Sequence, residues 1–202
     1  MGGTPYVLKG DTMKTLLKGT IFGGLTLFFW GWISWMVIPW HNATLNALIN
    51  EPLVEQVLIA TAPEKAVYLL PSGEKSVSPI PPAEKEAHRK AAMGKWEKGF
   101  SAFLVMNPQG TGSMPMHMVK GLLTQMLAAL LGTWLLVKAK LSGLGERVLF
   151  VVVFALAAGV VTHVPYWNWW GFPANYTLVS IADLIVGWAL AGAVISGFAL
   201  EK

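Results

Sequence analysis

Residues 20–40 read TIFGGLTLFFWGWISWMVIPW, a run without a single charged side chain. A helix of this length crosses the roughly 30 Å hydrocarbon core of a bilayer. Three comparable apolar runs follow near residues 121–137, 148–164 and 176–200, and Asp183 is the only charge that interrupts the last of them. The sequence therefore predicts four membrane-spanning helices.

The composition of the whole chain points the same way. Of the 202 residues, 54% are hydrophobic and only 13% are charged, whereas a soluble domain carries about 25% charged residues. The ten tryptophans suit a chain with several membrane–water boundaries, where indole rings accumulate. The chain has no cysteine, which excludes disulfides, thiolate metal sites and cysteine-linked lipid anchors.

These runs predict an all-α membrane protein, a four-helix transmembrane bundle with a small extracytoplasmic α+β domain between the first and second spans. We expect a cytoplasmic N-terminus at residues 1–19, a first transmembrane helix at 20–40, the outside domain at 41–115, and helices two to four with short loops at 116–202. Within the outside domain the pattern predicts an amphipathic helix over 45–58, strands at 66–70 and 100–106, and a polar helix over 83–98.

The basic residues give the chain an orientation. On the four-span model they fall on one side of the membrane, which the positive-inside rule makes cytoplasmic. We therefore expect both termini in the cytoplasm, the domain at 41–115 in the periplasm, and a location in the bacterial cytoplasmic (inner) membrane. These residues are Lys9, Lys14, Lys18, Lys138, Lys140, Arg147 and Lys202.

The opposite, outer boundary is marked by aromatic residues. Pro165 is expected to close the third helix, and the segment after it is an uncharged, aromatic turn. Tryptophan in such a position anchors a chain at headgroup level. The expected interface anchors are Trp40, Trp167, Trp169 and Trp170.

Two charges lie inside the predicted spans. Lys120 and Asp183 each fall about 10 Å below the outer boundary, counted at 1.5 Å per helical residue. A charge at that depth is costly and usually finds a partner, so we expect an intramembrane Lys120–Asp183 pair. The pair either clamps two helices in register, which we favour, or belongs to an outer-facing relay or pocket; no ionisable residue continues such a path into the inner half.

Potential metal ligands gather at the same level. Met114, His117 and Met118 share one face of a helix, and thioether and imidazole groups suit copper. The same histidines could instead hold a b-type haem, although methionine and histidine are also ordinary residues at a helix start near an interface. The candidate metal ligands are His41, Met114, Met116, His117, Met118 and His163.

The function predicted from these features is ranked. No nucleophile elbow, zinc-protease motif, phosphate loop or dinucleotide fingerprint occurs, and the balanced charges of 41–115 make nucleic acid an unsuitable partner. The leading hypothesis is a non-catalytic accessory or assembly subunit of a larger membrane complex, in contact with lipids and with other subunits or further copies of itself. An outer-face copper or haem redox protein is the alternative, and a small transporter component ranks third.

Overall fold

The computed structural model describes residues 10–73 and 78–200, so the predictions for residues 1–9, including Lys9, and for Lys202 lie outside the described residues. The described chain is mostly helical and divides into two compact units. We call residues up to Asn46 and from Ser113 onward the helical unit, and Ala47–Gly112 the inserted unit. The elements in chain order are α1 (Gly10–Met36), η1 (Asn42–Thr44), α2 (Glu51–Thr61), β1 (Val67–Leu70), η2 (Pro82–Glu84), α3 (Lys85–Lys98), β2 (Ala102–Val105), α4 (Met114–Ala139), α5 (Leu144–Trp170) and α6 (Ala174–Phe198).

Four helices of the helical unit, α1, α4, α5 and α6, are long and apolar enough to cross a membrane, which fits an integral membrane protein as the sequence predicts. No more than 22% of the apolar window of each helix is buried inside the structure. The remaining apolar surface suits contact with lipid, since a helix with apolar side chains all round needs a non-aqueous neighbour.

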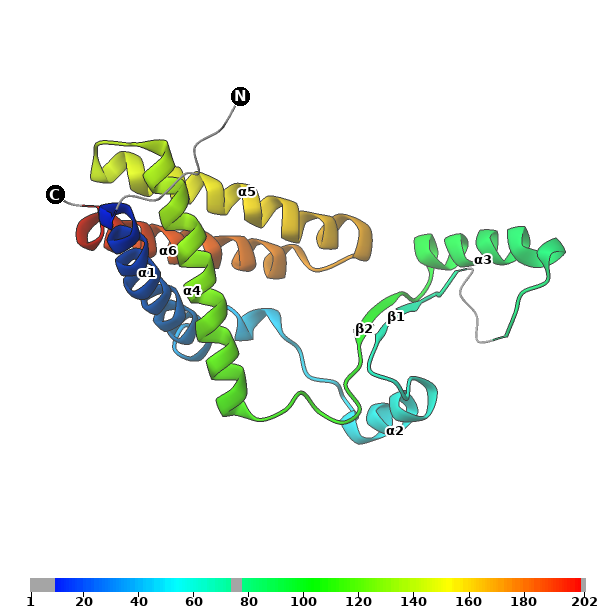
Figure 1. Cartoon of the computed structure of the whole chain (residues 1–202). Coiled ribbons are helices and arrows are strands. Elements are labelled where there is room, and N and C mark those ends of the chain that lie inside the picture. Colours follow the sequence, from blue (N-terminus) through cyan, green and yellow to red (C-terminus); the bar gives the residue numbers. More distant parts are fainter. Residues whose placement is uncertain (1–9, 74–77, 201–202) are drawn as a thin grey trace, which may run out of the picture. The chain divides into compact units, whose positions relative to one another are not determined.

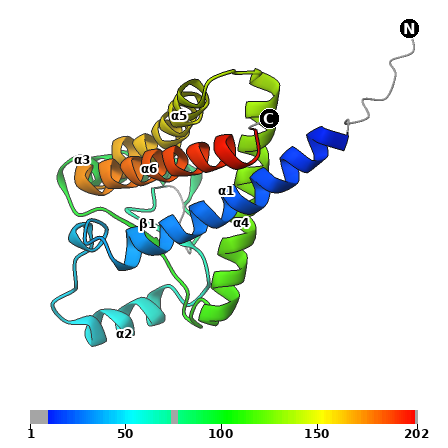
Figure 2. The same ribbon diagram turned by 90° about the vertical axis from the view of Figure 1, so that its left-hand side faces the viewer.

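Small residues bring these helices together. Helix α1 packs against α4 and α6, while α5 packs along α6 (Figures 1 and 2). A Cβ atom added at Gly24 of α1 would lie 2.8 Å from the Cα of Met126 in α4, and one added at Gly187 of α6 would lie 2.8 Å from the Trp30 ring. The α4 backbone at Gly24 and the Trp30 ring at Gly187 can approach this closely because glycine has no side chain.

The contacts between α1 and α4 place Lys14, Lys138 and Lys140 at the same end of this helix pair. Gly19 of α1 lies against Thr133 of α4, while Gly24 lies against Met126, so the two helices run antiparallel. Lys14 and Lys138 therefore lie at the same end of the α1–α4 pair. The short turn that contains Lys140 connects α4 to α5 at that end.

Helix boundaries differ from the sequence expectation in two places. Helix α1 covers Gly10–Met36 rather than 20–40, so it includes Lys14 and Lys18 and ends before Trp40. Pro165 does not close α5 but lies inside it. The helix ends instead at Gly171, whose φ of 69° is left-handed and whose N–H donates to the Tyr166 carbonyl, because glycine enters this conformation without steric cost.

The inserted unit contains one two-stranded antiparallel sheet, in which Val67 pairs with Val105 and Leu70 with Ala102. Both strands and the polar helix α3 lie where the sequence predicts them. Helix α2 starts later than expected, at Glu51, because the Asn50 side chain accepts the Leu53 N–H and caps it. On the surface of α3, hydrogen bonds from Arg89 lower the pKa of the Glu86 carboxyl.

Candidate functional site: a polar cluster on Asp183

The chain folds back on itself directly after α1. The N–H groups of Val37 and Ile38 both donate to the Ile33 carbonyl and end the helix. The Trp40 indole Nε1 then donates to the Ser34 carbonyl at 3.1 Å and to the Ser34 hydroxyl at 3.0 Å. This turn carries His41 back toward the last turns of α1.

Asp183 of α6 is the acceptor on which these residues converge. Its Oδ1 accepts the Trp30 Nε1–H at 2.7 Å and the Ser34 hydroxyl at 2.6 Å. Its Oδ2 lies 3.6 Å from His41 Nε2, which also lies 3.1 Å from Ser34 Oγ. We call Trp30, Ser34, Trp40, His41 and Asp183 the Asp183 cluster.

Burial and stacking fix this cluster in place. Ser34 has no exposed surface and His41 is 3% exposed, whereas the Asp183 side chain retains 21% exposure. The His41 ring stacks on Trp35 with centroids 3.9 Å apart and an interplanar angle of 6°. The Thr44 hydroxyl donates to the His41 carbonyl at 2.7 Å and holds the turn from the other side.

The hydrogen bonds determine where the protons lie. An oxygen–oxygen distance of 2.6 Å requires a shared proton, and the Ser34 hydroxyl supplies it to the Asp183 carboxylate. The Ser34 oxygen is therefore left to accept, from Trp40 and from His41 Nε2. In this arrangement the His41 tautomer with a hydrogen on Nε2 is the one that can donate to Ser34 Oγ.

Serine, histidine and aspartate occur together here, but they do not form a nucleophilic triad. In a triad the histidine accepts the serine proton on one ring nitrogen and donates to the aspartate from the other. In this protein the same Nε2 faces both Ser34 and Asp183, and the serine hydroxyl donates its hydrogen bond to Asp183 rather than to the histidine. The Asp183 cluster is thus a hydrogen-bonded clamp that joins α1, the turn after it and α6.

The expected contact between Lys120 and Asp183 is not formed. Among the described residues, Asp183 lies within 4 Å of His41, Glu86 pairs with Arg89, and Lys120 is exposed on α4. Asp183 is instead contacted by Trp30 and Ser34 of α1 and by His41 of the turn after it, because α6 packs against α1. Sequence periodicity missed Trp30 and Ser34, although their spacing of four residues on one helical face was the available signal.

The six candidate metal ligands lie on three parts of the helical unit. His41 belongs to the Asp183 cluster, the methionines and His117 are exposed in the first turns of α4, and His163 is half-buried on α5. No group of three or more histidine, aspartate or glutamate side chains that could hold a metal ion occurs within residues 10–73 and 78–200. Of the tryptophans predicted to be interface anchors, Trp40 belongs to the Asp183 cluster. Trp167, Trp169 and Trp170 are exposed at the end of α5.

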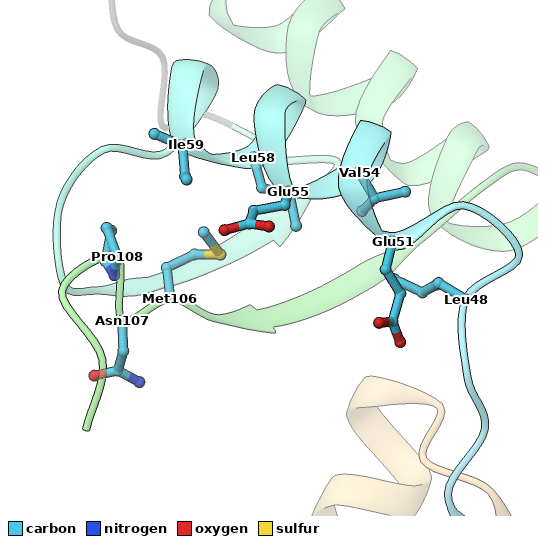
Figure 3. Close-up of a pocket in the computed structure, with 9 residues that line it drawn as sticks. All are labelled: Leu48, Glu51, Val54, Glu55, Leu58, Ile59, Met106, Asn107 and Pro108. Carbon is cyan, nitrogen blue, oxygen red and sulfur yellow. The ribbon is translucent and has the colours of Figure 1, made fainter. Parts of the chain in front are cut away.

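A separate groove occurs in the inserted unit, between α2 and the segment that follows β2 (Figure 3). Its volume is about 360 Å³. Figure 3 shows Met106 extending toward α2 near Glu55, so the groove combines apolar walls with carboxylates. It is lined by Leu48, Glu51, Val54, Glu55, Leu58, Ile59, Met106, Asn107 and Pro108.

Comparison of the chain with protein-family models, with curated proteins and with solved structures gave no match.

Proposed function

We propose that this protein is a non-catalytic accessory or assembly subunit of a larger membrane protein complex, and that the inserted unit docks on a partner protein. The observation that carries the proposal is how little the inserted unit buries. Among its described residues, Ala62 is the only hydrophobic residue that is buried. A unit of this size with its own core would enclose several large apolar side chains.

The apolar side chains of the inserted unit are instead on its surface. Leu48, Leu53 and Val57 are each more than half exposed, and neither α2 nor α3 contains a buried residue. A two-stranded sheet is only marginally stable without a helix or further strands packed on it. Contact with another protein supplies the surface that this unit lacks.

The groove along α2 indicates the chemistry of the partner. Its floor is apolar, and the carboxylates of Glu51 and Glu55 stand along it one helical turn apart (Figure 3). This arrangement favours a protein segment with apolar side chains and a nearby lysine or arginine, because a buried apolar anchor supplies affinity and paired charges fix register.

For the helical unit we propose an anchoring role in the bacterial cytoplasmic membrane, with both termini in the cytoplasm and the inserted unit in the periplasm. The end that carries Lys14, Lys18 and Lys138 supports this orientation. The Asp183 cluster supports a structural role, since its only serine is buried and already donates its proton.

The test is gentle purification of the tagged full-length chain from its native membrane, followed by the native mass of the particle and identification of its subunits. We expect a large particle with a partner in fixed stoichiometry. A particle that contains only copies of this chain would refute the proposal.

A matched pair of variants then tests the groove. Leu48→Glu places a charge on the groove, whereas Met93→Glu makes the same kind of change on α3, away from it. Both side chains are more than half exposed, at 58% and 52%, so neither change disturbs a core. We expect Leu48→Glu to lose the partner and Met93→Glu to keep it; equal retention by both variants would exclude the groove as the docking surface.

A further inference from the structure

A second cavity lies in the helical unit, where α5 ends and α6 begins. Its volume is about 200 Å³, and it is lined by His163, Tyr166, Phe172, Tyr176 and Thr177. The Phe172 ring lies 5.3 Å from the Tyr166 ring and 5.6 Å from the Tyr176 ring, measured between centroids. The cavity therefore has an aromatic wall and is separate from the Asp183 cluster.

One polar group of this cavity, the Thr177 hydroxyl, is buried without a hydrogen-bond partner among the described residues. Thr177 is 5% exposed, and its hydroxyl oxygen is buried without a hydrogen bond. Threonines elsewhere in the helices donate to the carbonyl four residues earlier, as Thr124 does to Lys120 and Thr162 does to Ala158. A buried hydroxyl left unpaired costs free energy comparable to a lost hydrogen bond. The missing hydrogen bond of the Thr177 hydroxyl therefore needs an explanation.

His163 adds a second group of the same kind. Its imidazole is half-buried, and no hydrogen bond to it occurs among the described residues. A neutral imidazole donates from one nitrogen, and a threonine hydroxyl in a helix has two common rotamers, of which one frees it from the backbone. The cavity thus offers hydrogen-bond donors to a ligand oxygen.

The size and location of the cavity limit the kind of ligand that it can bind. Pockets for drug-sized molecules are about 300–1,000 Å³, so a cavity of about 200 Å³ suits a single substituted ring. Thr177 lies in the first turn of α6, and the exposed tryptophans at the end of α5 lie just before it in the chain. Tryptophans of this kind mark the membrane–water boundary, where an amphiphile keeps its ring while its tail extends into hydrocarbon.

We propose that this cavity binds the ring of a membrane-soluble quinone, with a ring carbonyl oxygen accepting hydrogen bonds from Thr177 and His163 and the ring lying against Tyr166, Phe172 and Tyr176. This inference goes beyond the proposed accessory role and does not depend on it. A carbonyl acceptor satisfies the unpaired donors, and a planar ring matches the aromatic wall.

The experiment uses the full-length chain in lipid nanodiscs, with a short-tailed benzoquinone as the probe. Calorimetric titration should give saturable binding of one quinone per chain. The infrared carbonyl band of the bound quinone should move to lower frequency, because hydrogen bonding weakens the C=O bond. Uptake that rises linearly with concentration, or an unshifted band, would show only partition into the bilayer and would overturn the proposal.

Two threonine variants complete the test. Thr177→Val removes the hydroxyl while keeping the shape of the side chain, and Thr124→Val makes the same change at an exposed position on α4. We expect Thr177→Val to weaken quinone binding roughly tenfold, in the range for one hydrogen bond, without lowering the melting temperature of the quinone-free protein. Equal quinone affinities for the two variants would contradict the assignment.

Discussion

Ser34 connects three elements of the helical unit through one hydroxyl group. It donates to Asp183 and accepts from Trp40, while His41 lies within hydrogen-bond distance of it. In a low-dielectric setting such a network is strong only when all of its members are satisfied. Single side chains in this cluster therefore have effects that extend beyond their own contacts.

A reactivity probe distinguishes a clamp from a catalytic site. The Ser34 hydroxyl donates a hydrogen bond to Asp183, and the side chain is wholly buried. We therefore expect a fluorophosphonate reagent not to label the folded protein. Intact-protein mass measurement after incubation checks this expectation, with a serine hydrolase as the positive control. Modification that maps to Ser34 would mean that the hydroxyl is an activated nucleophile.

The charge of Asp183 is tested by a change that preserves its shape. In Asp183→Asn the new amide turns an N–H group toward His41 Nε2 or toward the donors Trp30 and Ser34, so at least one side chain of the cluster loses its acceptor. We expect a loss of about 1–3 kcal/mol in the free energy of unfolding, measured by denaturant titration in detergent. The control Asp11→Asn, on an exposed residue of the first turn of α1, should cost less than about 1 kcal/mol.

At the scale of helices, the small residues of α1 separate into two classes. A Cβ atom at Gly24 would lie 2.8 Å from the backbone of Met126, whereas one at Gly31 would meet nothing within 4 Å. Sequence alone could not separate them, because both glycines occur in the same apolar run. The difference arises from which face of α1 contacts α4.

These two glycines provide a matched prediction for helix packing. Gly24→Ala should destabilise the protein by about 1–3 kcal/mol, because backbone atoms of α4 cannot yield as a side chain does. Gly31→Ala should be neutral or stabilising by up to about 1 kcal/mol, from helix propensity alone. Thermal unfolding of both variants in the same detergent measures the difference, and a larger loss for Gly31→Ala would show that the α1–α4 interface is misassigned.

The sequence predicted the elements that depend on local pattern. Long apolar runs identified the four spans, and short apolar runs ended by turn residues placed β1 and β2. It did not predict that Pro165 remains within α5, because a proline near a membrane boundary can be accommodated while Gly171 ends the helix. The partner of Asp183 was equally inaccessible, since the contact with His41 depends on a non-helical turn that periodicity does not encode.

At the scale of the whole molecule, the proposed orientation in the membrane can be tested by labelling. The chain has no native cysteine, so single-cysteine variants can be labelled without background. With a membrane-impermeant maleimide on intact cells whose outer membrane is permeable to the reagent, we expect Met93→Cys in α3 to react. We expect Ser142→Cys, in the turn between α4 and α5, to react only after the inner membrane is opened.

Both positions are exposed in the structure, so a failure to react reports the membrane barrier rather than burial. The reverse labelling pattern would invert the proposed topology. Labelling of both variants in intact cells would be incompatible with four membrane crossings.

The fold-back after α1 also determines how mechanical load passes through the protein. The chain between α1 and the inserted unit contains His41 and Thr44. A force applied along this segment must break the hydrogen bonds of these two residues before it acts on α1. The second connection of the inserted unit has no comparable restraint, because Ser113 makes no capping hydrogen bond and the first turns of α4 are exposed. A force on the inserted unit would therefore act directly on the start of α4, whereas the Asp183 cluster holds α1 and α6 together.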